Sequence, residues 1–272
     1  MVKIIKLAFV FCVVVNFSFA AKVDTVAIYS TAMQKSINCV VVKPDGYKKK
    51  KAFSVVYLLH GYSGDYSNWI VKVPSLKKYA DNFNLLLVCP DGGFSSWYFD
   101  SPIDTTYKYE THIVNEVVSY IDSHYKTIPN KTNRAITGLS MGGHGAFFLA
   151  LRHPNIFGVI GATSGGVNLK ESKNKYDIAK RIGDTLNYAN NWNNLTIINL
   201  IEKYATTNQS MIFDCGIKDI FINGNRQLHQ KMLQLNITHT YIEREGEHNW
   251  AYWQNAIPYQ LLFFKNYFST NH

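Results

Sequence analysis

The segment Gly138-Leu139-Ser140-Met141-Gly142 places a serine between two glycines in the pattern G-x-S-x-G. It follows an apolar run that predicts a strand and precedes a pattern that predicts a helix, which is the context of a nucleophile elbow. An elbow holds its serine on a sharp, strained turn, and glycines are needed where neighbouring backbone comes close. A tight turn that only packs is the alternative. The context favours Ser140 as a nucleophile, with the Met141 amide as an oxyanion donor at the helix N-terminus.

A serine hydroxyl needs a base to take its proton and a carboxylate to orient that base. His248 lies between the last predicted strand and the last predicted helix, and it alone among nine histidines has this place in the order serine, acid, histidine. Asp219 follows the strand that ends near Cys215, so we expect it at the same sheet edge as Ser140. Helix capping is the alternative role for Asp219. Asp214, within the strand, is the competing acid.

The segment His60–Gly64 follows an earlier predicted strand and begins with a His-Gly pair. In enzymes with a nucleophile elbow the second oxyanion donor comes from such a loop, so the Tyr62 amide is the candidate and Gly61 allows close backbone approach. Trp69 closes this loop, and Trp97 follows an Asp-Gly-Gly turn where it could stack on a sugar or an aromatic acyl group. We therefore predict Gly61, Trp69 and Trp97 as substrate-binding residues, with packing under a cap as the alternative for Trp97.

These residues need a scaffold in which strands and helices alternate along the chain. Apolar runs predict strands at 37–43, 53–59, 84–89, 134–137, 159–163, 210–215 and 240–243, and helical patterns predict helices at 75–82, 107–125, 142–152, 220–235 and from 250 to about 267. This alternation implies an α/β fold with a doubly wound, mostly parallel sheet and helices on both faces. The first two strands are expected to form an antiparallel hairpin at one edge.

Residues 165–208 form a polar stretch, rich in Asn and Lys, with weak helical pieces. Long irregular segments in compact domains are uncommon and are usually functional or mobile. We expect a cap-like insertion beside the site, within a single domain over residues 21–272.

The first twenty residues have the features of a signal peptide. Lys3 and Lys6 precede the apolar run Leu7–Val15, and Ser18-Phe19-Ala20 has small residues where a signal peptidase would cleave. The run is shorter than the roughly 20 apolar residues that span a bilayer. We therefore expect a secreted or periplasmic mature chain without a membrane span.

The composition of the 272 residues, with 47% hydrophobic and 17% charged, excludes a disordered tail, a collagen-like repeat and a coiled coil. The net charge of +9 owes much to the lysine run at 48–51. No aromatic residues interleave that run, so we expect a solvated loop and no nucleic-acid partner. Cys39, Cys89 and Cys215 lie in or at the ends of apolar runs, and no C-x-x-C or H-E-x-x-H spacing occurs. We therefore expect neither a disulfide framework, nor a metal site, nor a cofactor.

Several motifs together resemble the esterase D-type family of α/β-hydrolases, which includes feruloyl and acetyl-xylan esterases, S-formylglutathione hydrolases and mycolyltransferases. They span nearly the whole mature chain and comprise His60-Gly61 to Trp69, Pro90-Asp91-Gly92 to Trp97-Tyr98, the elbow with Gly143 and Gly145-Ala146, His153-Pro154 with Phe157-Gly158, Cys215-Gly216 to Asp219, and His248 to Trp253. The resemblance implies an α/β-hydrolase fold. It also implies Ser140, Asp219 and His248 as the triad and the Tyr62 and Met141 amides as the oxyanion hole.

The resemblance and the expected export favour a serine carboxylic-ester hydrolase that forms an acyl-enzyme and removes acetyl or feruloyl groups from plant polysaccharide. An acyltransferase of the mycolyltransferase type shares the same residues and differs in its acceptor. An S-formylglutathione hydrolase-like thioesterase is a further alternative, which export disfavours. A non-catalytic carbohydrate-binding protein would be expected to lack one triad residue, and all three are present. The oligomeric state is left open.

Overall fold

A computed structural model describes residues 21–49, 52–204 and 208–270. Within them, eight strands form one sheet in the order β1-β2-β4-β3-β5-β6-β7-β8. Strand β2 pairs antiparallel with β1 and β4, and the other neighbouring strands are parallel. The predicted mostly parallel sheet is therefore confirmed. The strands are β1 (Lys22–Ser30), β2 (Lys35–Lys43), β3 (Val55–Leu59), β4 (Leu86–Pro90), β5 (Arg134–Gly138), β6 (Val159–Thr163), β7 (Ser210–Gly216) and β8 (Thr240–Arg244).

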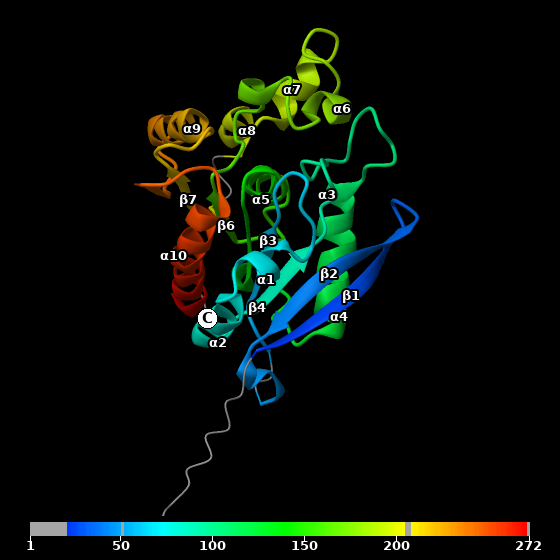
Figure 1. Cartoon of the computed structure of the whole chain (residues 1–272), viewed down its shortest axis with the longest axis vertical. Helices are drawn as coiled ribbons and strands as arrows, with labels where there is room; N and C mark the ends of the chain where they lie inside the picture. The colour runs from blue at the N-terminus through cyan, green and yellow to red at the C-terminus, as the bar shows by residue number, and fades with distance from the viewer. Residues whose placement is uncertain (1–20, 50–51, 205–207, 271–272) are drawn as a thin grey trace, which may run out of the picture.

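Helices cover both faces of the sheet (Figure 1). One hydrophobic cluster includes side chains of α4, α5 and α9, and the other includes side chains of α1, α2 and α10, so the sheet is doubly wound. The helices are α1 (Asn68–Lys72), α2 (Leu76–Phe83), α3 (Tyr109–Thr111), α4 (Val118–His124), α5 (Met141–Arg152), α6 (Ile178–Ile182), α7 (Ala189–Leu195), α8 (Ile197–Lys203), α9 (Ile222–Gln234) and α10 (Trp250–Thr270). A π-helical segment, η2 (His112–Val117), joins α3 to α4, so the predicted helix at 107–125 consists of three pieces.

Strand β3 lies in the middle of the sheet because both of its faces are apolar. Val55, Tyr57 and Leu59 belong to one hydrophobic cluster, and Val56 and Leu58 belong to the other. A strand covered on both faces has a continuous apolar sequence rather than an alternating one.

The predicted hairpin between residues 37–43 and 53–59 is wrong. Strand β3 pairs with β4 and β5, whereas β2 forms its hairpin with β1, a strand that the sequence analysis missed. Most of β1 is exposed or half-buried, with Ile28 and Ser30 buried near its end. A polar edge strand gives a weak periodic signal.

The segment between β6 and β7 folds into η4 (Leu169–Ser172), α6, α7 and α8. Figure 1 shows α6, α7 and α8 grouped at one end of the molecule. Apolar side chains from all three helices join the core cluster of α5, namely Ile178, Ile182, Trp192, Ile197, Leu200 and Ile201. The segment is therefore packed against the sheet domain.

No helix in the described ranges is long and apolar enough to cross a membrane. The predicted signal peptide, residues 1–20, lies outside the described residues.

Candidate active site

Ser140 occupies a sharp turn between β5 and α5. Its φ of 55° and ψ of −116° lie in a region that non-glycine residues rarely adopt. The Ser140 amide donates to the Thr163 carbonyl of β6 at 3.1 Å, and the Ser140 carbonyl accepts from the His144 amide at 3.1 Å. The neighbouring strand and the first turn of α5 thus hold the serine in this conformation.

The glycines of the elbow are required by close backbone contacts. A Cβ atom on Gly142 would lie 2.4 Å from the Leu59 carbonyl oxygen, and one on Gly138 would lie 2.5 Å from the Gly142 carbonyl. Atoms cannot approach so closely, so neither position accepts a side chain without backbone movement. The G-x-S-x-G pattern is explained by the contact of α5 with the end of β3.

Hydrogen bonds join Ser140, His248 and Asp219 in a chain. The Ser140 hydroxyl donates to His248 Nε2 at 2.9 Å, and His248 Nδ1 donates to both carboxylate oxygens of Asp219, each at 2.9 Å. The rings of Phe221 and Trp253 pack edge-on against the imidazole, with centroids at 5.0 and 4.9 Å. This arrangement fixes the tautomer in which Nε2 can accept the serine proton.

Asp219 also closes the turn that follows β7. Its Oδ1 accepts from the Phe221 amide at 2.8 Å, and its side chain is fully buried. Asp219 therefore stabilises the turn before α9 as well as binding His248, but the N-cap residue of α9 is Phe221, so the alternative of a helix N-cap at Asp219 is not met.

Asp214, the competing acid, is engaged elsewhere. Its oxygens accept from the Thr163 hydroxyl and from Gln260 Nε2, each at 2.7 Å, and Arg244 lies 3.4 Å away. Burial raises the pKa of Asp214, although the bonds from Thr163 and Gln260 oppose that shift. Asp214 thus belongs to a buried polar network that links β7 to β6 and α10.

Among the described residues, the backbone amides of Tyr62 and Met141 have no protein acceptor. The Met141 amide is in the first turn of α5, where N–H groups have no helical partner. A Cβ atom on Gly61 would lie 2.7 Å from Leu139 Cδ1 and 3.5 Å from Ser140 Cβ. The absence of a side chain at Gly61 therefore lets the loop before Tyr62 pack directly on the elbow.

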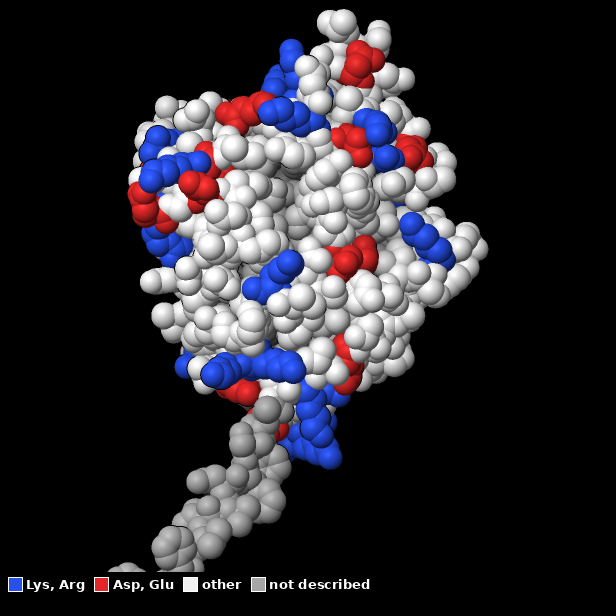
Figure 2. Space-filling view, viewed as in Figure 1, with Lys and Arg blue, Asp and Glu red and all other residues white. Residues whose placement is uncertain are grey.

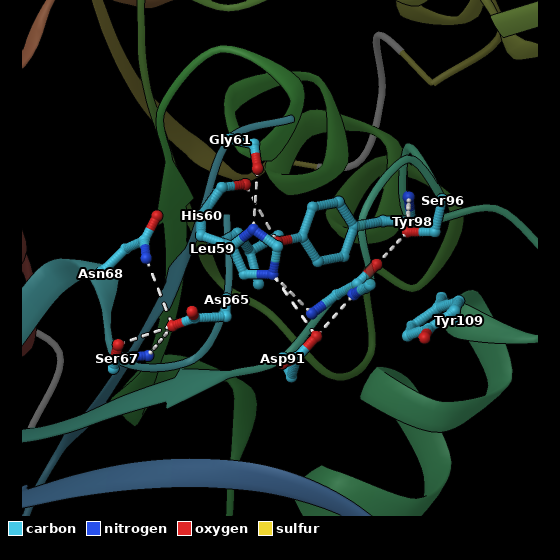
Figure 3. Close-up of polar contacts among 12 residues, drawn as sticks. Leu59, His60, Gly61, Asp65, Ser67, Asn68, Asp91, Ser96, Tyr98 and Tyr109 are labelled. Carbon is cyan, nitrogen blue, oxygen red and sulfur yellow. Dashed lines mark hydrogen bonds and ion pairs between the residues drawn. The ribbon is translucent and has the colours of Figure 1, made fainter. Parts of the chain in front are cut away.

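His60 holds that loop in place (Figure 3). Its Nδ1 donates to the Gly61 carbonyl at 2.8 Å, and its Nε2 accepts from the Gly92 amide at 2.8 Å. The Tyr98 hydroxyl donates to the His60 carbonyl at 3.1 Å. His60 is 1% exposed. The His60 imidazole thus ties the loop that carries Tyr62 to the turn after β4.

The expectation that Trp69 and Trp97 contact substrate is corrected by the structure. Each is 1% exposed, which leaves no ring face for a ligand. Trp69 Nε1 donates to the Leu59 carbonyl at 3.0 Å, and Trp97 Nε1 donates to the Tyr176 carbonyl at 3.0 Å. Trp97 thus packs against the segment between β6 and β7, which is the alternative weighed for it, and Trp69 packs beside the end of β3.

Sequence reasoning missed two aromatic residues at the site, Tyr176 and Phe221. The ring centroid of Tyr176 lies 5.4 Å from that of Tyr62 and 6.2 Å from that of Phe221. Phe221 could have been found from its place two residues after Asp219. Tyr176 lies in the insertion, where no motif distinguished it.

Among the described residues, neither metal-binding clusters, nor charge, nor free thiols indicate a second site. These residues include no group of three or more His, Cys, Asp or Glu side chains that could hold a metal ion. Basic and acidic side chains are interspersed over the face in Figure 2. Cys39, Cys89 and Cys215 are buried free thiols.

Comparisons with known proteins identify the family of this chain. A family model, Esterase, described as "Putative esterase", matches residues 30–264. The chain is 25% identical over 250 residues to an acetyl esterase of Caldicellulosiruptor saccharolyticus, covering 84% of this chain and 92% of the relative. It is 27% identical over 243 residues to the diacylglycerol acyltransferase/mycolyltransferase Ag85A of Mycobacterium gordonae, covering 76% of this chain and 70% of the relative.

A solved structure of a ferulic acid esterase superposes with a TM-score of 0.80 at 27% identity, covering 92% of this chain and 99% of the other. The family match covers far more than half of the chain. The chain therefore belongs to the esterase family of α/β-hydrolases and is a serine carboxylic-ester hydrolase.

Proposed function

We propose that this protein hydrolyses esters through a covalent acyl-enzyme on Ser140, with His248 as general base and acid and Asp219 as the residue that orients it. One observation carries the proposal: hydrogen bonds join Ser140 to His248 and His248 to Asp219. The Tyr62 and Met141 amides, which have no protein acceptor, are the oxyanion donors that we assign. Each step of acyl transfer has a group suited to it in this arrangement.

His248 Nε2 takes the proton as Ser140 Oγ bonds to the ester carbonyl carbon. The carbonyl oxygen becomes an oxyanion, and the Tyr62 and Met141 amides donate to it. The protonated His248 then gives its proton to the leaving alkoxide as the ester C–O bond breaks. Water, activated by the same imidazole, cleaves the acyl-enzyme and restores the serine.

We assign acetyl or feruloyl groups on plant polysaccharide as the substrate class. The names of two relatives, an acetyl esterase and a ferulic acid esterase, support this assignment. The composition of residues 1–20 supports export as a secreted or periplasmic enzyme, and we assign residues 165–208 as a cap-like insertion.

A substrate panel on the purified protein tests the hydrolytic function. p-Nitrophenyl acetate, methyl ferulate and acetylated xylan oligomers should be hydrolysed, and Ser140→Ala should serve as the blank. Equal rates for the wild type and Ser140→Ala would contradict the acyl-enzyme proposal.

The similarity to a mycolyltransferase supports acyl transfer as a second candidate. An added alcohol acceptor distinguishes the two functions. A hydrolase releases mostly free acid, whereas a transferase forms mostly the new ester.

A further inference from the structure

A row of aromatic rings extends from Tyr62, in the loop after β3, to His248. The centroid of the Tyr62 ring lies 5.0 Å from the ring centroid of Phe94 and 5.4 Å from that of Tyr176. The Tyr176 ring lies 6.2 Å from Phe221, whose ring lies 5.0 Å from the His248 imidazole. Tyr176 therefore joins the two halves of the row, and it is the member that the 165–208 insertion contributes.

The backbone at Tyr176 is strained and firmly held. Tyr176 and Asp177 have φ values of 57° and 55°, in the left-handed region that L-residues rarely adopt. Trp97 Nε1 donates to the Tyr176 carbonyl at 3.0 Å. Asp177 lies 2.8 Å from Lys180 Nζ and accepts from the Tyr62 hydroxyl at 3.4 Å. Such strain persists where surrounding contacts determine the conformation, and these contacts aim the Tyr176 ring at Tyr62.

Three residues of the row, Tyr62, Phe94 and Tyr176, keep accessible surface, whereas Phe221 is 3% exposed and is buried. Tyr62 and Tyr176 are half-buried, and Phe94 is 56% exposed. Aromatic rings that present a face or an edge to solvent can pack offset or edge-on against another planar ring. The row thus offers an apolar wall next to the atoms that would bind the ester.

We propose that Tyr176 is a specificity-determining residue that packs against a planar aromatic group of the ester. This inference rests on the proposed function, since it presupposes attack by Ser140. The aromatic group can belong to the acid or to the alcohol part of the substrate. In both arrangements the ring lies against Tyr176 while the carbonyl oxygen meets the amides of Tyr62 and Met141.

Two matched pairs of esters test the inference and separate its two sources. Methyl ferulate against methyl acetate varies the acid, and phenyl acetate against ethyl acetate varies the alcohol. Tyr176→Ala should lower kcat/KM for the aromatic member of one pair by about two- to tenfold, the effect of losing one aromatic contact of about 0.5–1.5 kcal/mol. The aliphatic member of that pair should change less than about twofold on the same scale. Tyr176→Phe should keep the wild-type preference.

Tyr188→Ala is the matched control, because Tyr188 lies in the same insertion and is 42% exposed. It should leave the preference unchanged. Thermal melts check that the variants are folded, and Tyr176→Leu replaces Tyr176→Ala if the latter unfolds.

Equal changes for all four esters, or no change in any, would overturn the role of Tyr176. A wild-type protein that hydrolyses none of the four and does not react covalently at Ser140 would instead overturn the proposed function, and this inference with it.

Discussion

Replacing Asp219 by Asn should separate the orientation of His248 from the stability of the fold. Asp219 Oδ1 accepts from the Phe221 amide at 2.8 Å, so the amide oxygen of Asn is expected to keep that place. The NH₂ group then replaces Oδ2 and faces His248 Nδ1, so it favours the tautomer that carries its proton on Nε2, while the Nδ1–H tautomer keeps only its bond to Oδ1. The Nε2–H tautomer cannot accept the proton of Ser140.

The expected loss in kcat is about 10⁴-fold, or about 5 kcal/mol in activation free energy. The melting temperature should change little, since the bond to Phe221 is retained. Initial rates on p-nitrophenyl acetate and thermal melts measure the two quantities. A loss in kcat below about tenfold would refute the assignment of Asp219.

Asp214→Asn is the matched comparison, because it makes the same chemical change at a buried aspartate five residues earlier, in strand β7. Its NH₂ group would face Gln260 Nε2 or the Thr163 hydroxyl, which now donate to the carboxylate at 2.7 Å. One unsatisfied buried group costs about 1–3 kcal/mol. The melting temperature should fall by about 2–10 °C, and kcat should change less than about tenfold. If the two phenotypes were reversed, Asp214 would be the acid.

Three further predictions concern the elbow, the buried core and metal dependence. Gly142→Ala places a Cβ atom 2.4 Å from the Leu59 carbonyl oxygen and should lower the free energy of unfolding by about 1–3 kcal/mol. Gly46→Ala is the control and should not lower it, because no atom lies within 4 Å of the added Cβ. Equal free energies of unfolding for the two variants in urea melts would contradict this prediction. Burial lowers the pKa of His144 to about 4, so between about pH 6.5 and pH 4 the imidazole is protonated in the unfolded chain but not in the folded one. The free energy of unfolding should therefore fall by up to about 3 kcal/mol as the pH drops through this range. His144→Gln should flatten that dependence, and an unchanged slope would exclude His144 as its source. Excess chelator should leave the rate unchanged because side chains and amides fill each catalytic role; a loss that Zn²⁺ or Ca²⁺ restores would reveal a missed site.

Much of the site could be predicted because its parts depend on local sequence. The turn at Ser140 needs glycines two residues before and after it, and the contacts of Gly138 and Gly142 explain both. The places of Asp219 and His248 follow from chain order and from the edge where parallel strands end. These signals require no knowledge of distant contacts.

Features that depend on distant contacts could not be predicted. The residue type of Trp69 and Trp97 does not reveal whether they are buried. Their burial involves contacts with residues distant in sequence, such as Trp250 for Trp69 and His144 for Trp97. The pairing of β2 with β1 depends on an edge strand with few buried residues. Tyr176 reaches Tyr62 across more than one hundred residues of sequence, through a conformation that no local pattern indicates.

Covalent labelling tests the central claim, that Ser140 is the nucleophile, most directly. A fluorophosphonate reagent should inactivate the enzyme at one label per chain, and peptide mass spectrometry should find that label on Ser140. Ser140→Ala should take up no label, and His248→Ala should react far more slowly because the serine loses its base. Inactivation with the label on another residue, or equal labelling of Ser140→Ala, would contradict the account.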